Sequence, residues 1–234
     1  MSDAGGSDHV EVTAGVESGV GADAVVDLIG ALAYGQLTAF FHLSRDAERA
    51  PTLTARAELA RLAVAEFSRY EVLRRRLDAM QVAPEAAMEP FVAALDAFHE
   101  RTAPSDYAEG LVKAYVGEGI GADFYREISV FLGADVHALV SDLVSDDGQA
   151  EFVVSQVRSA IEADPRLAGR LALYGRRMVG EALSQAQRVA ADRDALTSLL
   201  LGGSPTADLS ELVKMFGRLT EAHSRRMSRL GLSA

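Results

Sequence analysis

The chain has 234 residues and no cysteine; 49% of its residues are apolar, 6% are aromatic, and the net charge is −11. The absence of cysteine excludes a disulfide framework, a cysteine-ligated zinc site and thiol catalysis. The acidic charge makes nucleic acid a poor default partner, because affinity for nucleic acid comes largely from neutralising phosphates. We find neither a basic leader with an apolar core nor an apolar run of the roughly 20 residues that cross a bilayer, so we expect a soluble, cytoplasmic protein with no membrane partner.

The first segment is rich in Gly, Ser, Asp and Val and has no apolar period. The first 44 residues contain no Lys or Arg and carry −6 of the net charge, from Asp3, Asp8, Glu11, Glu17, Asp23 and Asp27. We therefore predict a disordered acidic tail over residues 1–22, followed by a single helical domain over residues 23–232.

The helical pattern begins near Ala24, where apolar residues recur at threes and fours and predict a helix over 24–44. Thr54 is the expected N-cap of a second helix, which runs to about Met80. Pro84 opens a shorter helix that reaches about residue 99, with a bend near Pro90.

The next two predicted helices form the middle of the chain. Ser105 is the expected cap of a helix over about 105–132, and Gly133 ends it. A continuous helix is predicted to follow over 136–163.

The C-terminal part is also predicted to be helical. Pro165 fits the first turn of a helix that reaches about residue 201, and GGSP at 202–205 is a loop. A last helix starts at Asp208 or Ser210 and ends near residue 230. Strand signals are absent and the connections are short, so the predicted fold is all-α, an antiparallel helical bundle.

The first two long helices resemble the next two in sequence. AYGQL (33–37) aligns with YVGEG (115–119) at an offset of 82, and AEFSRYE (65–71) aligns with SDDGQAE (145–151) at an offset of 80. Two helix pairs in register over about 50 residues each predict a pseudo-twofold four-helix core, to which the C-terminal helices are added.

The repeat aligns polar residues in a recognisable pattern. Residues i and i+3 of a helix share a face, so two helices would each present one such pair, and the other two would each present a single polar residue. A Glu from each of two helices plus Glu-x-x-His from each of the other two is the arrangement of di-iron carboxylate proteins. The chain has residues at all six positions, which are Gln36, Glu66, Arg69, Glu118, Asp146 and Gln149. Carboxylate ligands occur at three of them: Glu66, Glu118 and Asp146.

Longer stretches resemble a known family over about residues 24–231. They are LAYGQLTAFF (32–41), APTL (50–53), MEPFVAALDAFHERTAPSD (88–106), LVKAYVGEGIGADFYREI (111–128), DDGQAEF (146–152) and GRLALYGRRMVGEALSQAQRVAADRDAL (169–196). The chain resembles the actinobacterial ferritin-like family related to the tRNA methylthio-isopentenyladenosine hydroxylases. The resemblance implies a ferritin-like bundle and a non-haem di-iron ancestry. It also implies that members with a complete site have Glu at position 36 and His at positions 69 and 149.

Our first interpretation is a metal-free polar core. Arginine cannot ligate a metal because its guanidinium stays protonated, whereas it pairs well with carboxylates. Arg69 is then expected to form a buried ion-pair network with Glu66, Glu118 and Asp146. Under this interpretation the chain binds no cofactor and acts as a structural or interaction protein, with an unidentified protein or with itself as a homodimer.

Two alternatives remain open. In one, Glu66, Glu118 and Asp146 still hold iron, and the chain is a hydroxylase or oxygenase acting on a modified tRNA nucleoside or a small organic substrate. In the other, Glu66 and Arg69 form an ordinary solvated ion pair on the surface of the second helix, which contributes a few tenths of a kcal/mol to stability. Arginine runs at 74–76, 176–177 and 225–226 would face tRNA in the first case, although acids lie beside each run.

The histidines provide no metal motif. The five histidines never stand at i, i+3 or i, i+4 spacing, so we assign none of them to a metal site.

Overall fold

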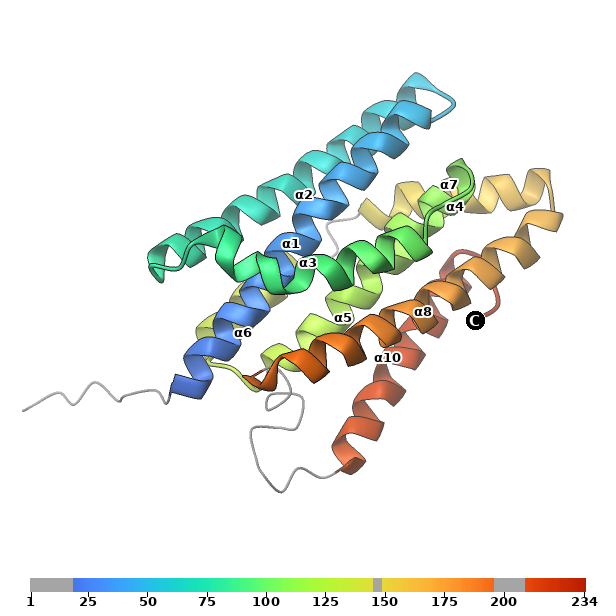
Figure 1. The fold of residues 1–234 in the computed structure, drawn as a ribbon. Helices are drawn as coiled ribbons and strands as arrows, with labels where there is room; N and C mark the ends of the chain where they lie inside the picture. Colours follow the sequence, from blue (N-terminus) through green and yellow to red (C-terminus); the bar gives the residue numbers. More distant parts are fainter. Residues whose placement is uncertain (1–18, 145–148, 196–208) are drawn as a thin grey trace, which may run out of the picture.

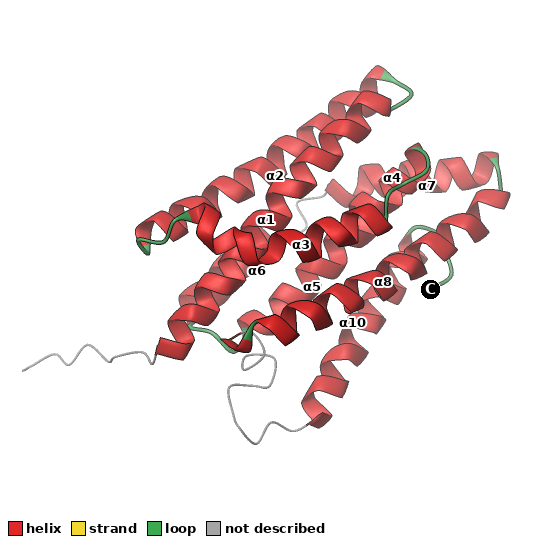
Figure 2. Cartoon of the chain, viewed as in Figure 1, coloured by secondary structure: helices red, strands yellow, loops and turns green. Residues whose placement is uncertain are grey.

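The structure is a computed structural model that describes residues 19–144, 149–195 and 209–234. Every regular element among these residues is a helix (Figure 2), which confirms the all-α prediction. Residues 1–18, which make up most of the predicted acidic tail, lie outside the described residues.

The first two helices form an antiparallel hairpin at one side of the molecule (Figure 1). They are α1 (Gly19–Arg49) and α2 (Leu53–Ala79). Helix α1 begins within the predicted tail, five residues before Ala24. The N-cap of α2 is Thr52 and not the predicted Thr54, because Thr52 has an extended backbone and its hydroxyl accepts a hydrogen bond from the Ala55 amide at 3.1 Å.

Helix α3 (Pro84–Arg101) crosses α1 closely, with Pro84 in its first turn and Pro90 within it. The close crossing depends on a glycine. A Cβ atom at Gly30 of α1 would lie 2.1 Å from the carbonyl oxygen of Ala87 in α3.

The predicted helix over 105–132 is observed as three consecutive segments: α4 (Tyr107–Val112), the π-helical turn η1 (Lys113–Gly117) and α5 (Glu118–Ser129). Its N-cap is Asp106 rather than Ser105, because the Asp106 carboxylate accepts the amide of Glu109 at 3.0 Å. Short π-helical turns within α-helices occur frequently at functional sites.

The predicted continuous helix over 136–163 is wrong. Two helices are observed instead, α6 (Ala134–Leu143) and α7 (Gln149–Ala163). Helix α6 ends because its C-cap residue, Val144, has backbone angles outside the helical region. Helix α8 (Arg166–Asp192) ends earlier than the predicted residue 201, because the backbone angles of Arg193 are not helical. The GGSP loop lies outside the described residues, and α10 (Leu209–Arg229) agrees with the predicted last helix.

The buried apolar residues form two clusters that both include α1. One cluster joins α1 and α2 to η1, α7, α8 and α10, through residues such as Leu59, Val116 and Met227. The other joins the N-terminal half of α1 to α2, α3, α5 and α6, through residues such as Leu28 and Phe91.

Among the described residues, one helix is long and apolar enough to cross a membrane, over Gly21–Arg49 of α1. Half of its most apolar window is buried within the molecule.

Candidate functional site

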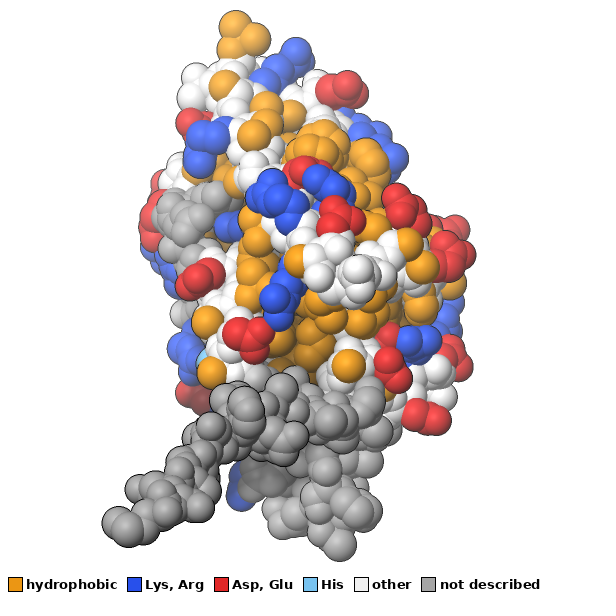
Figure 3. All heavy atoms as spheres, turned by 90° about the vertical axis from the view of Figure 1, so that its left-hand side faces the viewer, with side chains coloured by type: hydrophobic (Ala, Val, Ile, Leu, Met, Phe, Trp, Pro, Cys, Tyr) orange, Lys and Arg blue, Asp and Glu red, His pale blue; other side chains and the backbone are white. Residues whose placement is uncertain are grey.

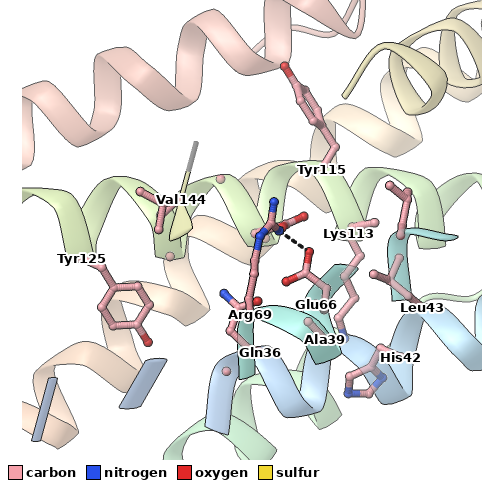
Figure 4. A pocket seen from close by; sticks show the side chains of 18 of the residues that line it. Gln36, Ala39, His42, Leu43, Glu66, Arg69, Lys113, Tyr115, Tyr125 and Val144 are labelled. Carbon is pink, nitrogen blue, oxygen red and sulfur yellow. Dashed lines mark hydrogen bonds and ion pairs between the residues drawn. The ribbon is translucent and has the colours of Figure 1, made fainter. Parts of the chain in front are cut away.

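A cavity of about 370 Å³ lies in the bundle and is lined by residues of α1, α2, η1 and α5 (Figure 4). Four of the six predicted site residues line it: Gln36, Glu66, Arg69 and Glu118. Asp146 lies outside the described residues. Gln149 begins α7, and only its backbone is described.

The guanidinium of Arg69 joins two carboxyl groups from different helices. Its Nη1 donates to Oε1 of Glu66 at 2.6 Å and to Oε1 of Glu118 at 3.0 Å. The side chain of Arg69 is 14% exposed and that of Glu66 is 1% exposed, whereas Glu118 is 42% exposed. Arg69 therefore lies inside the bundle, between a buried acid and a partly solvated one.

The environment of Glu66 opposes a negative charge. Burial raises the pKa of Glu66, the neighbouring Glu118 carboxylate raises it further, and Arg69 lowers it. Two oxygens in this cavity, Oε2 of Glu66 and Oε1 of Gln36, are buried and have no hydrogen-bond partner. Arg69 therefore offsets the effects of burial and of Glu118 only in part, and the neutral form of Glu66 is favoured.

The described residues do not fit a di-iron centre. Arg69 lies at a position where the resemblance implies a histidine, and its protonated guanidinium offers no lone pair to a metal. Among the residues that the structure describes, no group of three His, Asp or Glu side chains is arranged to hold a metal ion.

A second polar group lies in the same cavity and was missed by the sequence analysis. The rings of His42 (α1) and His99 (α3) stack with centroids 4.1 Å apart, and Nε2 of His99 lies 3.2 Å from the Thr38 hydroxyl. The Lys113 amine donates to the carbonyl oxygen of His99 at 3.1 Å.

Burial shifts the pKa values of this group. It lowers the pKa of His42 to about 4 and that of His99 to about 2, with Lys113 contributing to both shifts. Burial also lowers the pKa of Lys113 to about 8. Three separate helical segments bring these residues together, so no local spacing could reveal them; the one signal was that Lys113 is one of only two lysines.

A family model described as the ferritin-like domain of actinomycetes matches residues 21–203. The chain belongs to this ferritin-like family. Its fold is similar to that of a solved Synechococcus protein, "Protein 19 with aldehyde deformylating oxidase activity", with a TM-score of 0.69 and 18% identity over 93% of this chain and 94% of that one. This similarity confirms the ferritin-like bundle. A search of curated proteins found no match. The relation to the tRNA hydroxylases stays a prediction.

The ferritin-like bundle contains a second cavity of about 340 Å³, lined by residues of α1, α3, α5, α8 and α10. Its walls are mostly apolar and include Phe91, Ile128 and Leu183. Phe98, Gly117, Gly121 and Tyr125, among others, line both cavities, so the two cavities share one wall along α5.

Two of the three arginine runs of this ferritin-like chain form ion pairs, whereas Arg176 and Arg177 donate to the carbonyl oxygens of Ser233 and Arg101. Arg74 contacts Glu71 and Asp78, Arg76 contacts Asp135, Arg225 contacts Glu221, and Arg226 contacts Asp123. On the face in Figure 3, basic side chains likewise lie among acidic ones. These contacts favour the interpretation of the runs as surface ion pairs over a surface for tRNA.

Proposed function

We propose that this ferritin-like chain is a non-catalytic binding protein whose core holds an arginine-centred ion pair in the place of a di-iron centre. The observation that carries the proposal is the position of Arg69, whose Nη1 contacts both Glu66 and Glu118 inside the bundle. The role that we propose is structural or one of interaction in the cytoplasm, with a protein partner or as a homodimer.

The ion pair also explains how the acids remain in the interior without a metal. A buried carboxyl group is costly unless it is paired and hydrogen-bonded. Arg69 supplies both a charge and donors, and the cavity beside it leaves room for a small molecule.

The test is metal content, measured by mass spectrometry on protein expressed with added iron and purified without a chelator. We expect essentially no iron in the natural chain. The triple variant Gln36→Glu, Arg69→His, Gln149→His restores the complete ligand set and is expected to bind up to about two irons per chain. Arg69→Lys alone is the matched control and should bind none, whereas about two irons in the natural chain would overturn the proposal.

A second candidate function is a di-iron oxygenase acting on a modified tRNA nucleoside or a small organic substrate. The similarity to a protein with aldehyde deformylating oxidase activity favours it, as does a cavity that reaches Glu66 and Glu118. This candidate requires iron on those two residues and on Asp146, so the same measurement separates the two functions.

A further inference from the structure

Lys113 is a buried amine that lines the first cavity. It is 7% exposed, begins the π-helical turn η1 and extends toward His42 in Figure 4. Its Nζ lies 5.9 Å from the centre of the Phe98 ring. The other lysine, Lys214, lies exposed on α10.

The structure gives this amine little compensation for a positive charge. Among the described residues no carboxylate forms an ion pair with it, and its hydrogen bond to the His99 carbonyl uses one of three donors. Asp46 of α1 raises its pKa, but burial lowers it more and Arg177 of α8 lowers it further, to about 8. About a tenth of the amine is therefore uncharged and nucleophilic at pH 7, and this fraction grows as the pH rises toward 8.

The apolar part of the cavity wall suits an aliphatic molecule, whereas Glu66, Arg69 and Glu118 form a separate polar part. Leu43, Leu62 and Leu95 line the cavity together with the polar group around Lys113. A small ligand with one reactive polar atom and an apolar body matches this combination.

We propose that Lys113 is a carbonyl-binding residue, whose amine forms a reversible imine with a small aliphatic aldehyde or ketone in this cavity. The amine nitrogen attacks the carbonyl carbon, the C=O π bond opens, and the proton lost by nitrogen goes to oxygen to give a carbinolamine. Loss of water then forms the C=N bond, and no oxidant or reductant takes part. This inference goes beyond the proposed function, because it requires no particular metal content.

The test is reductive labelling of the full chain with hexanal and cyanoborohydride at neutral pH. The borohydride reduces an imine to a stable secondary amine, which peptide mass spectrometry assigns to a lysine. We expect Lys113 to be labelled at least about tenfold faster than Lys214, because burial favours the uncharged form of the Lys113 amine and the cavity holds the aldehyde beside it. Labelling of Lys113 no faster than that of Lys214 would overturn the inference.

Two controls separate cavity binding from general reactivity. Lys214→Arg should leave the labelling rate of Lys113 unchanged, and Lys113→Arg should leave that of Lys214 unchanged. Excess hexanol, which has the same shape without the carbonyl, should slow labelling of Lys113 only. If hexanol has no effect, the aldehyde does not bind in the cavity and the inference fails. Iron is measured on the same preparations, so failure here is distinguishable from failure of the proposed function.

Discussion

Arg69 is the residue on which the charge balance of the first cavity depends. Glu66 is almost fully buried, one of its oxygens has no hydrogen-bond partner, and Arg69 donates to the other. Removing the donor of a buried hydrogen bond leaves the acceptor without a partner, which costs more than the hydrogen bond itself contributes.

We predict that Arg69→Met lowers the free energy of unfolding by about 1–3 kcal/mol at pH 7, because it removes the hydrogen bond that the buried Oε1 of Glu66 accepts. Glu118→Gln is the matched comparison; it should cost less than about 1 kcal/mol, since Glu118 is 42% exposed. Urea unfolding followed by circular dichroism measures both values. Equal losses in the two variants would show that Arg69 does not compensate Glu66.

The stacked histidines predict an acid-sensitive stability. Burial lowers the pKa of His42 to about 4 and that of His99 to about 2, so below pH 6.5 the unfolded chain binds protons that the folded chain excludes. Stability should therefore fall as the pH falls from 6.5 toward 4, by up to about 1.4 kcal/mol per pH unit for each histidine. Unfolding curves at several pH values measure this slope. The variant His42→Gln, His99→Gln should have a shallower slope, and parallel pH profiles would contradict the prediction.

The i, i+3 spacing and the repeat singled out Glu66, Arg69, Gln36 and Glu118, and these four residues line one cavity. Neither the i, i+3 spacing nor the repeat could reveal the group around Lys113. His42, His99 and Lys113 come from three separate helical segments, and only the packing of those segments brings them together.

At the scale of the elements, apolar periodicity predicted most helices but not their interruptions. The π-helical turn η1 leaves the apolar pattern on both sides nearly unchanged, so the sequence predicted one continuous helix over 105–132. Helix α6 ends at Leu143, with Val144 as its C-cap. Neither residue is Pro or Gly, so no signal in the sequence marks the end of this helix. The cap positions at 52 and 106 were missed by one or two residues, because several adjacent polar residues qualify.

The crossing of α1 and α3 predicts the effect of a single methyl group. Gly30→Ala should destabilise the protein by about 2 kcal/mol or more, because its Cβ would lie 2.1 Å from a backbone oxygen and the helices must separate. Gly180→Ala, on an exposed face of α8 with nothing within 4 Å, should instead stabilise it by about 0.5–1 kcal/mol. Thermal unfolding distinguishes the two signs, and a neutral Gly30→Ala would show that α3 can shift.

At the scale of the whole molecule, the bundle extends beyond the residues that the family model matches. The family match ends at residue 203, yet α10 and the residues after it provide Met227, Leu230 and Leu232 to the main apolar cluster. Arg218 and Arg226 of α10 also pair with Glu127 and Asp123 of α5. The last helix is therefore part of the core rather than an appendage.

We predict that a chain ending at residue 208 fails to fold to a stable monomer, because it exposes the apolar surface that α10 covers. Met227→Ala tests the same packing without truncation; Met227 is 0% exposed, so the change should cost about 2–4 kcal/mol. Val213→Ser is the control on the same helix, with a side chain 70% exposed, and should cost less than about 0.5 kcal/mol. Size-exclusion chromatography and urea unfolding measure these outcomes. A monomeric, fully helical truncated chain would mean that the family domain folds without α10.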